Sequence, residues 1–190
     1  SVIRLLMLFI NRKKFESLAS VDENIISDIL IKAQEATQEA LLISESLINK
    51  VLIDLSELIL AKYEHILLEN KKDLDNFDIK NPKYDRLKLT KERLEGIAKD
   101  IKNVASLEYP VGKLLESKVL ENGLEITKIA VPLGVVAIIY EARPNVTFDV
   151  FSLCFKSGNV CVLKGGKEAN FSNKFIIQLI HKVLEKNNIN

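Results

Sequence analysis

Two short polar segments of this chain carry the residues best suited to bind a ligand. Residues 141–145 (EARPN) and 164–168 (KGGKE) each follow directly on an apolar run of strand length. In open α/β sheets, ligands bind outside the carboxyl ends of the strands, beside the N-termini of the following helices. Adjacent glycines let the backbone approach a ligand closely, and neighbouring lysines favour an anion. We therefore expect an anion-binding site here. The alternative is an ordinary βα turn with solvated lysines, since the GxGxxG fingerprint is absent.

The elements that would position these segments form a strand–helix–strand–helix unit. The apolar runs span residues 134–140 and 160–163, and the first is rich in β-branched residues. This is typical of strands buried on both faces of a parallel sheet. Between them, apolar residues recur at helical spacing over residues 146–156, and Gly158 follows where a helix end favours a residue that tolerates positive φ. With the amphipathic stretch that closes the chain, the pattern predicts a βαβα unit with a right-handed crossover.

The first half of the chain is helical and has no strand pattern of its own. A capping box at residues 20–23 (SVDE) opens a helix that we expect to run to about Leu42. A second helix is predicted from about Ser46 to Glu69, and a third begins after Thr90, whose hydroxyl can cap it. The polar stretch 69–83, which contains a proline, is interpreted as a solvated loop. These helices are expected to pack around the βαβα unit as one domain.

Residues 118–130 predict a β-hairpin. Alternating residues flank Asn122-Gly123, the strongest short-range signal for a two-residue hairpin turn. A two-stranded ribbon is marginal on its own, so it must pack on something. One alternative is that it folds back on its own domain.

Composition favours a soluble globular protein. The chain has 190 residues, of which 47% are hydrophobic and 28% charged, and its net charge of +1 provides no field for nucleic acid. The apolar run Ser1–Ile10 is far shorter than the roughly 20 residues that span a bilayer, so we expect no membrane partner. Cys154 and Cys161 lie in predicted buried elements, which indicates structural thiols in a reducing cytosol. His65 has no second histidine nearby, and we expect no metal site.

Three stretches of the sequence resemble one known enzyme family. They are residues 131–173 (VPLGVVAIIYEARPNVTFDVFSLCFKSGNVCVLKGGKEANFSN), Tyr84–Ile101 and Pro110–Lys113. They are similar to the γ-glutamyl phosphate reductases, or glutamate-5-semialdehyde dehydrogenases, of the aldehyde dehydrogenase superfamily, and the similarity extends from about Ile31 to the C-terminus. It implies an incomplete α/β fold: an aldehyde-dehydrogenase-like cofactor-binding domain in which a Rossmann-like βαβα unit carries N-terminal helices and a protruding β-hairpin. Residues 1–190 would be the N-terminal part of this NADP-binding domain, without the catalytic domain, and the hairpin would pair with another subunit of a homo-oligomer.

The resemblance also implies a function. It is the NADPH-dependent conversion of L-glutamyl 5-phosphate to L-glutamate 5-semialdehyde and phosphate, a cytoplasmic step of proline biosynthesis. Enzymes of this family use a cysteine thiolate as nucleophile, and we expect that cysteine in a second domain beyond Asn190, so that this chain alone is inactive. Cys154 and Cys161 are poor substitutes, because apolar surroundings raise the pKa of a thiol. The alternative is a non-catalytic cofactor-binding and oligomerisation module.

Cofactor contacts are implied at the ends of both strands. The residues are Tyr140 and Glu141 after the first strand, and Lys164, Gly165, Gly166 and Lys167 after the second. Lys164 stands where the superfamily's lysine approaches the adenosine ribose, and Lys167 stands where NAD-preferring enzymes often have a glutamate. A cation at that place suits the 2′-phosphate of NADP(H), although Glu168 is only one position away.

Arg143 and Asn145 are the candidate substrate residues. The superfamily's oxyanion-hole asparagine follows a Pro-Trp pair after the first strand, and here residues 140–143 (YEAR) occupy that place. Asn145 is a candidate amide donor to the oxyanion, and Arg143 is a candidate partner for an acyl phosphate or a carboxylate. For each residue, a purely structural role in the turn is the alternative.

Overall fold

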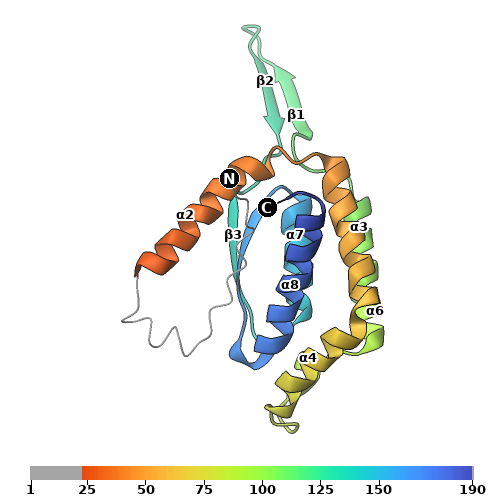
Figure 1. Cartoon of the computed structure of the whole chain (residues 1–190). Helices are drawn as coiled ribbons and strands as arrows, with labels where there is room; N and C mark the ends of the chain where they lie inside the picture. Colours follow the sequence, from red (N-terminus) through yellow and green to blue (C-terminus); the bar gives the residue numbers. More distant parts are fainter. Residues whose placement is uncertain (1–22, 190) are drawn as a thin grey trace.

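The computed structural model describes residues 23–189, which form a mixed helix-and-strand fold (Figure 1). Its elements are, in chain order, α2 (Glu23–Ala40), α3 (Glu45–Ala61), α4 (Tyr63–Asp75), α5 (Tyr84–Leu87), α6 (Lys91–Ser106), β1 (Leu114–Val119), β2 (Glu125–Ile129), β3 (Val135–Ile139), α7 (Asn145–Lys156), β4 (Val160–Lys164), the 3-10 turn η1 (Lys167–Ala169) and α8 (Asn170–Lys186). Figure 1 shows the β3–β4 ribbon between α2 on one side and α7 with α8 on the other, with α3 and α6 farther out. The N-terminal helices thus pack around the βαβα unit, as expected.

The predicted βαβα unit is present at the centre of the chain. β3 and β4 pair in parallel along their whole length, ending with Ile139 opposite Lys164, and α7 connects them. Gly158 follows α7 with a φ of +70°, as predicted for the helix end. A Cβ at this position would also lie 3.1 Å from the Cγ of Pro132. Both the backbone conformation and the available space therefore favour glycine.

The expectation that both strands are buried on both faces is wrong for β3. β4 is mostly buried, but the side chain of Ile139 is 74% exposed and Ala137 is exposed as well. In the described part of the chain this sheet has only the two strands, and the helices that cover it lie chiefly against β4. An apolar run at the edge of a narrow sheet has the same sequence pattern as a central strand, so the pattern does not separate the two.

One hydrophobic core joins the helices to the sheet. Its fully buried large side chains come from most of the helices and from β4, and they include Leu55, Leu94, Phe148, Phe151, Leu163 and Ile176. The rings of Phe151 and Phe155 stack within α7, with centroids 5.3 Å apart. Each such side chain contributes about 1.5–3 kcal/mol by leaving water. The core therefore fixes the positions of the two strand ends relative to the surrounding helices.

The second predicted helix is wrong in outline, because the chain forms two helices, α3 and α4, in its place. Lys62 separates them with φ −117° and ψ 15°, and its N–H is shared between the carbonyls of Leu58 and Ile59. α4 then continues to Asp75, so the first part of the predicted loop 69–83 is helical. The chain changes direction at the break (Figure 1), which lets α3 pack on α6 while α4 packs on α8.

The predicted helix ends have mixed outcomes. Thr90 caps α6 as predicted, because its Oγ1 accepts a hydrogen bond from the N–H of Arg93 at 3.2 Å. α2 ends at Ala40, slightly before the predicted Leu42. The predicted capping box at residues 20–23 begins outside the described residues.

β1 and β2 form an antiparallel hairpin that projects away from the helices (Figure 1). Its turn has three residues rather than the predicted two: the N–H of Leu120 donates to the carbonyl of Leu124 at 2.9 Å, and the N–H of Gly123 donates to the carbonyl of Leu120 at 2.9 Å. Gly123 has φ +83°, the left-handed conformation that closes such a loop. The Asn-Gly pair therefore marks the turn but not its length. Every residue of both strands is exposed, so the hairpin is not folded back on the rest of the described chain.

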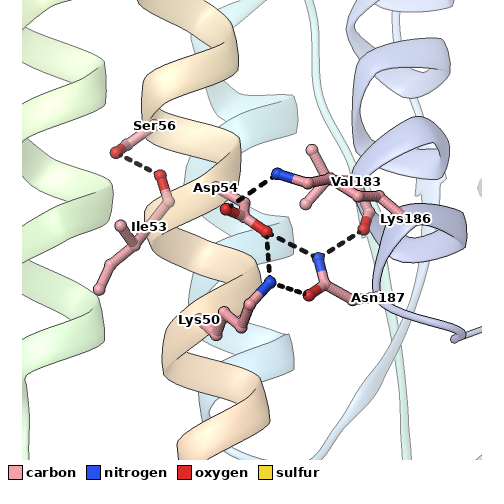
Figure 2. Close-up of polar contacts among 7 residues, drawn as sticks. All are labelled: Lys50, Ile53, Asp54, Ser56, Val183, Lys186 and Asn187. Carbon is pink, nitrogen blue, oxygen red and sulfur yellow. Dashed lines mark hydrogen bonds and ion pairs between the residues drawn. The ribbon is translucent and has the colours of Figure 1, made fainter.

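A cluster of charged and polar side chains ties α3 to α8 (Figure 2). Asp54 of α3 accepts a hydrogen bond from Nδ2 of Asn187 at 2.9 Å and pairs with Lys50 at 2.9 Å and with Lys186 at 3.3 Å. Desolvation raises the pKa of Asp54, but the hydrogen bonds from Asn187, Lys50 and Lys186 outweigh it and lower the pKa from 3.8 to about 2. The ionised carboxylate therefore holds the end of α8 against α3.

Candidate functional site

The two predicted ligand segments meet at the carboxyl end of the β3–β4 ribbon. The N–H of Tyr140 donates to the carbonyl of Lys164 at 3.0 Å, directly beyond β3. The N–H of Ala142 donates to Oε1 of Glu168 at 2.9 Å. Glu168 thus links the turn after β3 to the turn after β4.

The link depends on a close approach at Gly166. A Cβ on Gly166 would overlap the Glu168 carboxylate, so only glycine lets that carboxylate lie against the backbone. Ala142, which donates to the same carboxylate, has φ 43°, a conformation that is uncommon for a residue with a side chain. Residues held in such conformations cluster at ligand-binding and active sites.

A cavity of about 510 Å³ lies beside these turns. Its wall includes Glu141, Lys167 and Glu168 from the predicted segments, and also Lys83, which the sequence did not single out. Nζ of Lys83 pairs with Oε2 of Glu141 at 2.6 Å. Lys167 is exposed and makes no hydrogen bond or ion pair within the described residues. Lys167 is therefore available to an anionic ligand in this cavity.

Asp73 also lines this cavity, and it occupies the N-terminus of α8. Its carboxylate accepts hydrogen bonds from the N–H groups of Phe171 (3.0 Å) and Ser172 (2.8 Å) and from the hydroxyl of Ser172 (2.6 Å). Burial raises the pKa of Asp73 despite these bonds. Since the chain's own carboxylate already binds the first N–H groups of α8, a ligand anion here depends on lysine side chains rather than on this helix N-terminus.

Arg143 and Asn145 face a second cavity, of about 330 Å³. The structure thus separates the two predicted sets, because none of the predicted cofactor residues lines this cavity and neither Arg143 nor Asn145 lines the first. The remaining wall of the second cavity comes from α5, α6 and the segment between them.

Asn145 is held in place by α7 itself. Its Nδ2 donates to Oδ2 of Asp149 at 3.1 Å. Burial raises the pKa of Asp149; the hydrogen bond from Asn145 opposes this shift, and the nearby Asp100 adds to it. The Asn145 amide therefore has a fixed orientation at the cavity wall.

The Tyr140 side chain lies in a polar network beneath the turns. Its hydroxyl shares a hydrogen bond of 2.6 Å with Oγ1 of Thr147 on α7, which in turn donates to Oδ1 of Asn173 on α8 at 2.9 Å. Burial raises the pKa of Tyr140 to about 12. The phenol therefore stays neutral and joins β3 to both helices.

The two thiols lie away from both cavities. The side chain of Cys154 is 7% exposed and that of Cys161 is 1% exposed, and neither forms a disulfide. The hydrogen bond between the two thiols raises the pKa of Cys161, and burial raises it further. The same bond lowers the pKa of Cys154 against the effect of burial. The expected upward shift is therefore correct for Cys161 and wrong for Cys154, while both thiols are buried as expected.

Sequence reasoning missed several charged residues that line the cavities. Lys83 belongs to the stretch interpreted as a solvated loop, and Arg86, Arg93 and Asp100 belong to a segment that the family resemblance included without a role for any of them. Charges at close intervals in and beside a helix usually mark a solvated face. Only the fold shows that these residues line the same cavities as residues of the strand-end turns.

The described residues offer no sign of a metal site or a membrane span. His65 stacks on Phe175, with ring centroids 6.5 Å apart. Across residues 23–189, no three histidine, cysteine, aspartate or glutamate side chains gather as metal ligands would. Within the same range, no helix has both the length and the apolarity needed to cross a membrane.

No protein-family model matches the chain, but curated proteins do. It is 55% identical to the γ-glutamyl phosphate reductase of Bacteroides thetaiotaomicron over 157 residues, which are 83% of this chain and 38% of the relative. It is also 55% identical to the γ-glutamyl phosphate reductase of Chlorobium phaeobacteroides over 161 residues, 85% of this chain and 39% of the relative.

Solved structures agree with the sequence matches. The crystal structure of γ-glutamyl phosphate reductase from Thermotoga maritima superposes with a TM-score of 0.76 at 34% identity, over 81% of this chain and 38% of that one. The Saccharomyces cerevisiae enzyme of the same name gives a TM-score of 0.77 at 29% identity, over 83% of this chain and 42% of that one. The resemblance expected from the sequence is confirmed: the chain is related to γ-glutamyl phosphate reductases over most of its length, and it spans about 40% of theirs.

Proposed function

We propose that this chain is the N-terminal part of an NADPH-dependent reductase that converts L-glutamyl 5-phosphate to L-glutamate 5-semialdehyde and phosphate in proline biosynthesis. The observation that carries the proposal is the identity of 50–55% to γ-glutamyl phosphate reductases over most of the chain. The Glu168 link supports it, because it fixes the two strand-end turns at which a Rossmann-like domain binds its cofactor.

NADP(H) is the proposed cofactor, bound in the cavity that Lys167 lines. NADPH would supply the hydride that reduces the acyl phosphate. Lys167 provides an unpaired cation, and the glycine turn before it brings the backbone close to a ligand. Glu168 accepts a hydrogen bond from the N–H of Ala142, which reduces its repulsion of a phosphate without cancelling its charge. Glu141 is paired with Lys83, so it too is partly neutralised.

Arg143 and Asn145 are proposed to contact the substrate from the second cavity. Asn145 presents an amide whose orientation Asp149 fixes, as an oxyanion donor requires. The exposed guanidinium of Arg143 lies beside it in the cavity wall.

The nucleophilic cysteine is proposed to lie in the rest of the enzyme. Both thiols of this chain are buried and lie outside the two cavities. Their burial without a disulfide is also consistent with a reducing cytoplasm. This chain would therefore bind cofactor and substrate, and the remaining part would carry out the attack on the acyl phosphate.

The β1–β2 hairpin is proposed to pair with another subunit. Its strands expose Leu114, Leu115, Val119, Ile126 and Ile129 to solvent. Two strands alone are marginally stable, and a patch of exposed apolar residues is typical of an interaction surface. Pairing of the hairpin within a homo-oligomer would stabilise the two strands and cover their exposed apolar side chains.

Genetic complementation tests the proposed function. The complete gene should restore growth without proline to a bacterial strain that lacks its own γ-glutamyl phosphate reductase. The segment encoding residues 1–190 alone should not restore growth. If the complete gene, expressed as folded protein, fails to restore growth, the proposal is wrong, and the non-catalytic module becomes the better interpretation.

A further inference from the structure

We propose that the second cavity binds the α-amino-acid head of the substrate, with Arg86 and Arg143 for its α-carboxylate and Asp100 for its α-ammonium group. The inference rests on the proposed function, since it assigns one end of that substrate to one wall of the protein. It also predicts that the phosphoryl group of the substrate lies outside this cavity.

One cation of the cavity is already bound within the chain. Arg93 on α6 donates from Nη2 to both carboxylate oxygens of Asp85, at 2.9 and 3.0 Å. Its Nη1 donates to the backbone carbonyls of Asp85 and Lys88. Arg93 is thus a positioning residue, because it fixes the backbone on either side of Arg86 and leaves no donor pair for a ligand.

Three cations of the cavity wall remain open to a ligand: two arginines, and Lys88, whose ammonium group has no partner within the described residues. Arg86 and Arg143 are exposed and make no hydrogen bond or ion pair within the described residues. They come from different parts of the chain, Arg86 from α5 and Arg143 from the turn before α7. A guanidinium binds a carboxylate in a planar, two-pronged geometry, so this pair suits the α-carboxylate.

The cavity also offers negative charge, which separates an amino-acid head from a phosphate. Asp100 lines it and has no partner within residues 23–189, and it lies close enough to Asp149 to raise the pKa of that carboxyl. Two neighbouring carboxylates favour a cationic ligand. They would weaken the attraction of the open cations for a phosphate group, whereas an α-amino acid presents one charge of each sign and satisfies both sets of side chains.

Gly96 leaves room for this ligand. It lies inside α6, where glycine is unfavourable, and a Cβ at this position would meet no atom within 4 Å. Packing therefore does not require glycine here. Gly96 is part of the cavity wall, so the missing side chain enlarges the cavity.

Calorimetric binding of L-glutamate and glutarate to the complete enzyme tests the inference. The two ligands differ only in the α-amino group, so L-glutamate should bind more tightly. Asp100→Asn should weaken the binding of L-glutamate by about tenfold and leave the binding of glutarate unchanged or improved. Arg86→Gln should weaken the binding of both ligands by about tenfold. Lys99→Gln removes a charge from another face of α6, outside this cavity, and should leave both affinities unchanged.

A second variant, Gly96→Leu, tests the space in the cavity without removing a charge. It should reduce binding of both ligands severalfold while the thermal midpoint stays the same or rises, because leucine favours the helix. Equal affinities for L-glutamate and glutarate, with both displaced by inorganic phosphate, would overturn the inference and identify a phosphate site. Failed complementation with the amino-group preference intact would contradict the proposed function alone.

Discussion

At the scale of single residues, Lys167 and Glu168 have opposite roles in one turn. Glu168 is held by the N–H of Ala142 and packs over Gly166, so its charge serves the link between the two turns. Lys167 is exposed in the adjoining cavity and has no partner among the described side chains. Because its carboxylate is held in this link, Glu168 opposes an NADP(H) phosphate less than its position one residue from Lys167 suggests.

Replacing Lys167 by glutamate tests this assignment. Lys167→Glu should weaken NADPH binding by roughly tenfold or more, because a charge-assisted contact to the 2′-phosphate is worth about 1.5–3 kcal/mol. NADH binding should change little or improve. Fluorescence titration of the complete enzyme at low and high salt measures both, since an exposed ion pair can be worth almost nothing. Lys174→Glu makes the same charge change at an exposed site on α8 and serves as the control. Equal affinities for NADPH and NADH in the unmutated enzyme would show that Lys167 does not select NADP(H).

The candidate site divides into a part that the sequence predicts and a part that it does not. Residues 141–145 and 164–168 are predictable because parallel strands end at the same edge of a sheet. Lys83 and Arg86 are not, because their positions depend on how the chain beyond α4 is held. That segment is anchored by Asn70, whose buried side chain bonds the backbone of Leu87 and Leu89 at 2.9 and 2.8 Å. Nothing in the polar sequence distinguishes this buried asparagine from solvated neighbours.

At the scale of elements, a substitution in the hairpin turn tests the proposed oligomer. Gly123→Val places a β-branched residue at φ +83°, where an L side chain costs about 1–2 kcal/mol. The turn should open and the subunit pairing should weaken. Sedimentation of the complete enzyme should show an oligomer that dissociates at a higher concentration in the variant.

The control for this change is Glu121→Val, which adds the same side chain to the same turn without a positive φ. It should leave the association unchanged. A monomer before the substitution, and no difference after it, would exclude pairing through the hairpin.

The Asp54 cluster between α3 and α8 predicts a dependence of stability on pH. The folded pKa of about 2 lies below the ordinary 3.8, so the stabilisation is fully present above about pH 4 and is lost as the pH falls towards 2. Asp54→Asn should lower the free energy of unfolding by about 1–2 kcal/mol at pH 6 and by much less at pH 2.5.

Urea unfolding at both pH values measures the effect. Asp28→Asn makes the same change at an exposed position of α2 and should have little effect at either pH. An equal loss from Asp54→Asn at pH 6 and at pH 2.5 would show that the carboxylate charge contributes nothing.

The elements also show where sequence patterns fail. No proline or glycine marks the break at Lys62 in the sequence. The break follows from the packing of α3 and α4 on different partner helices. The βαβα unit is predictable because its strands and helix differ in period, whereas a helix that changes direction keeps the same period on both sides.

At the scale of the whole molecule, the two cavities share no lining residue, although residues of the turn after β3 line both. One is lined by candidate cofactor residues and the other by candidate substrate residues, and the strand-end turns carry the Glu168 link. This arrangement suits a protein that brings two ligands together. The proposal that the reactive thiol lies in the rest of the enzyme is supported by the burial of Cys154 and Cys161 in the core.

The measurement that tests this account most directly is phosphate-dependent reduction of NADP⁺ with L-glutamate 5-semialdehyde. It is run on the complete enzyme and on residues 1–190 alone. The account predicts turnover by the complete enzyme and none by the isolated chain, even at high concentration. Turnover by the isolated chain that disappears on Cys154→Ser or Cys161→Ser would contradict it, as would a folded complete enzyme that reduces no NADP⁺.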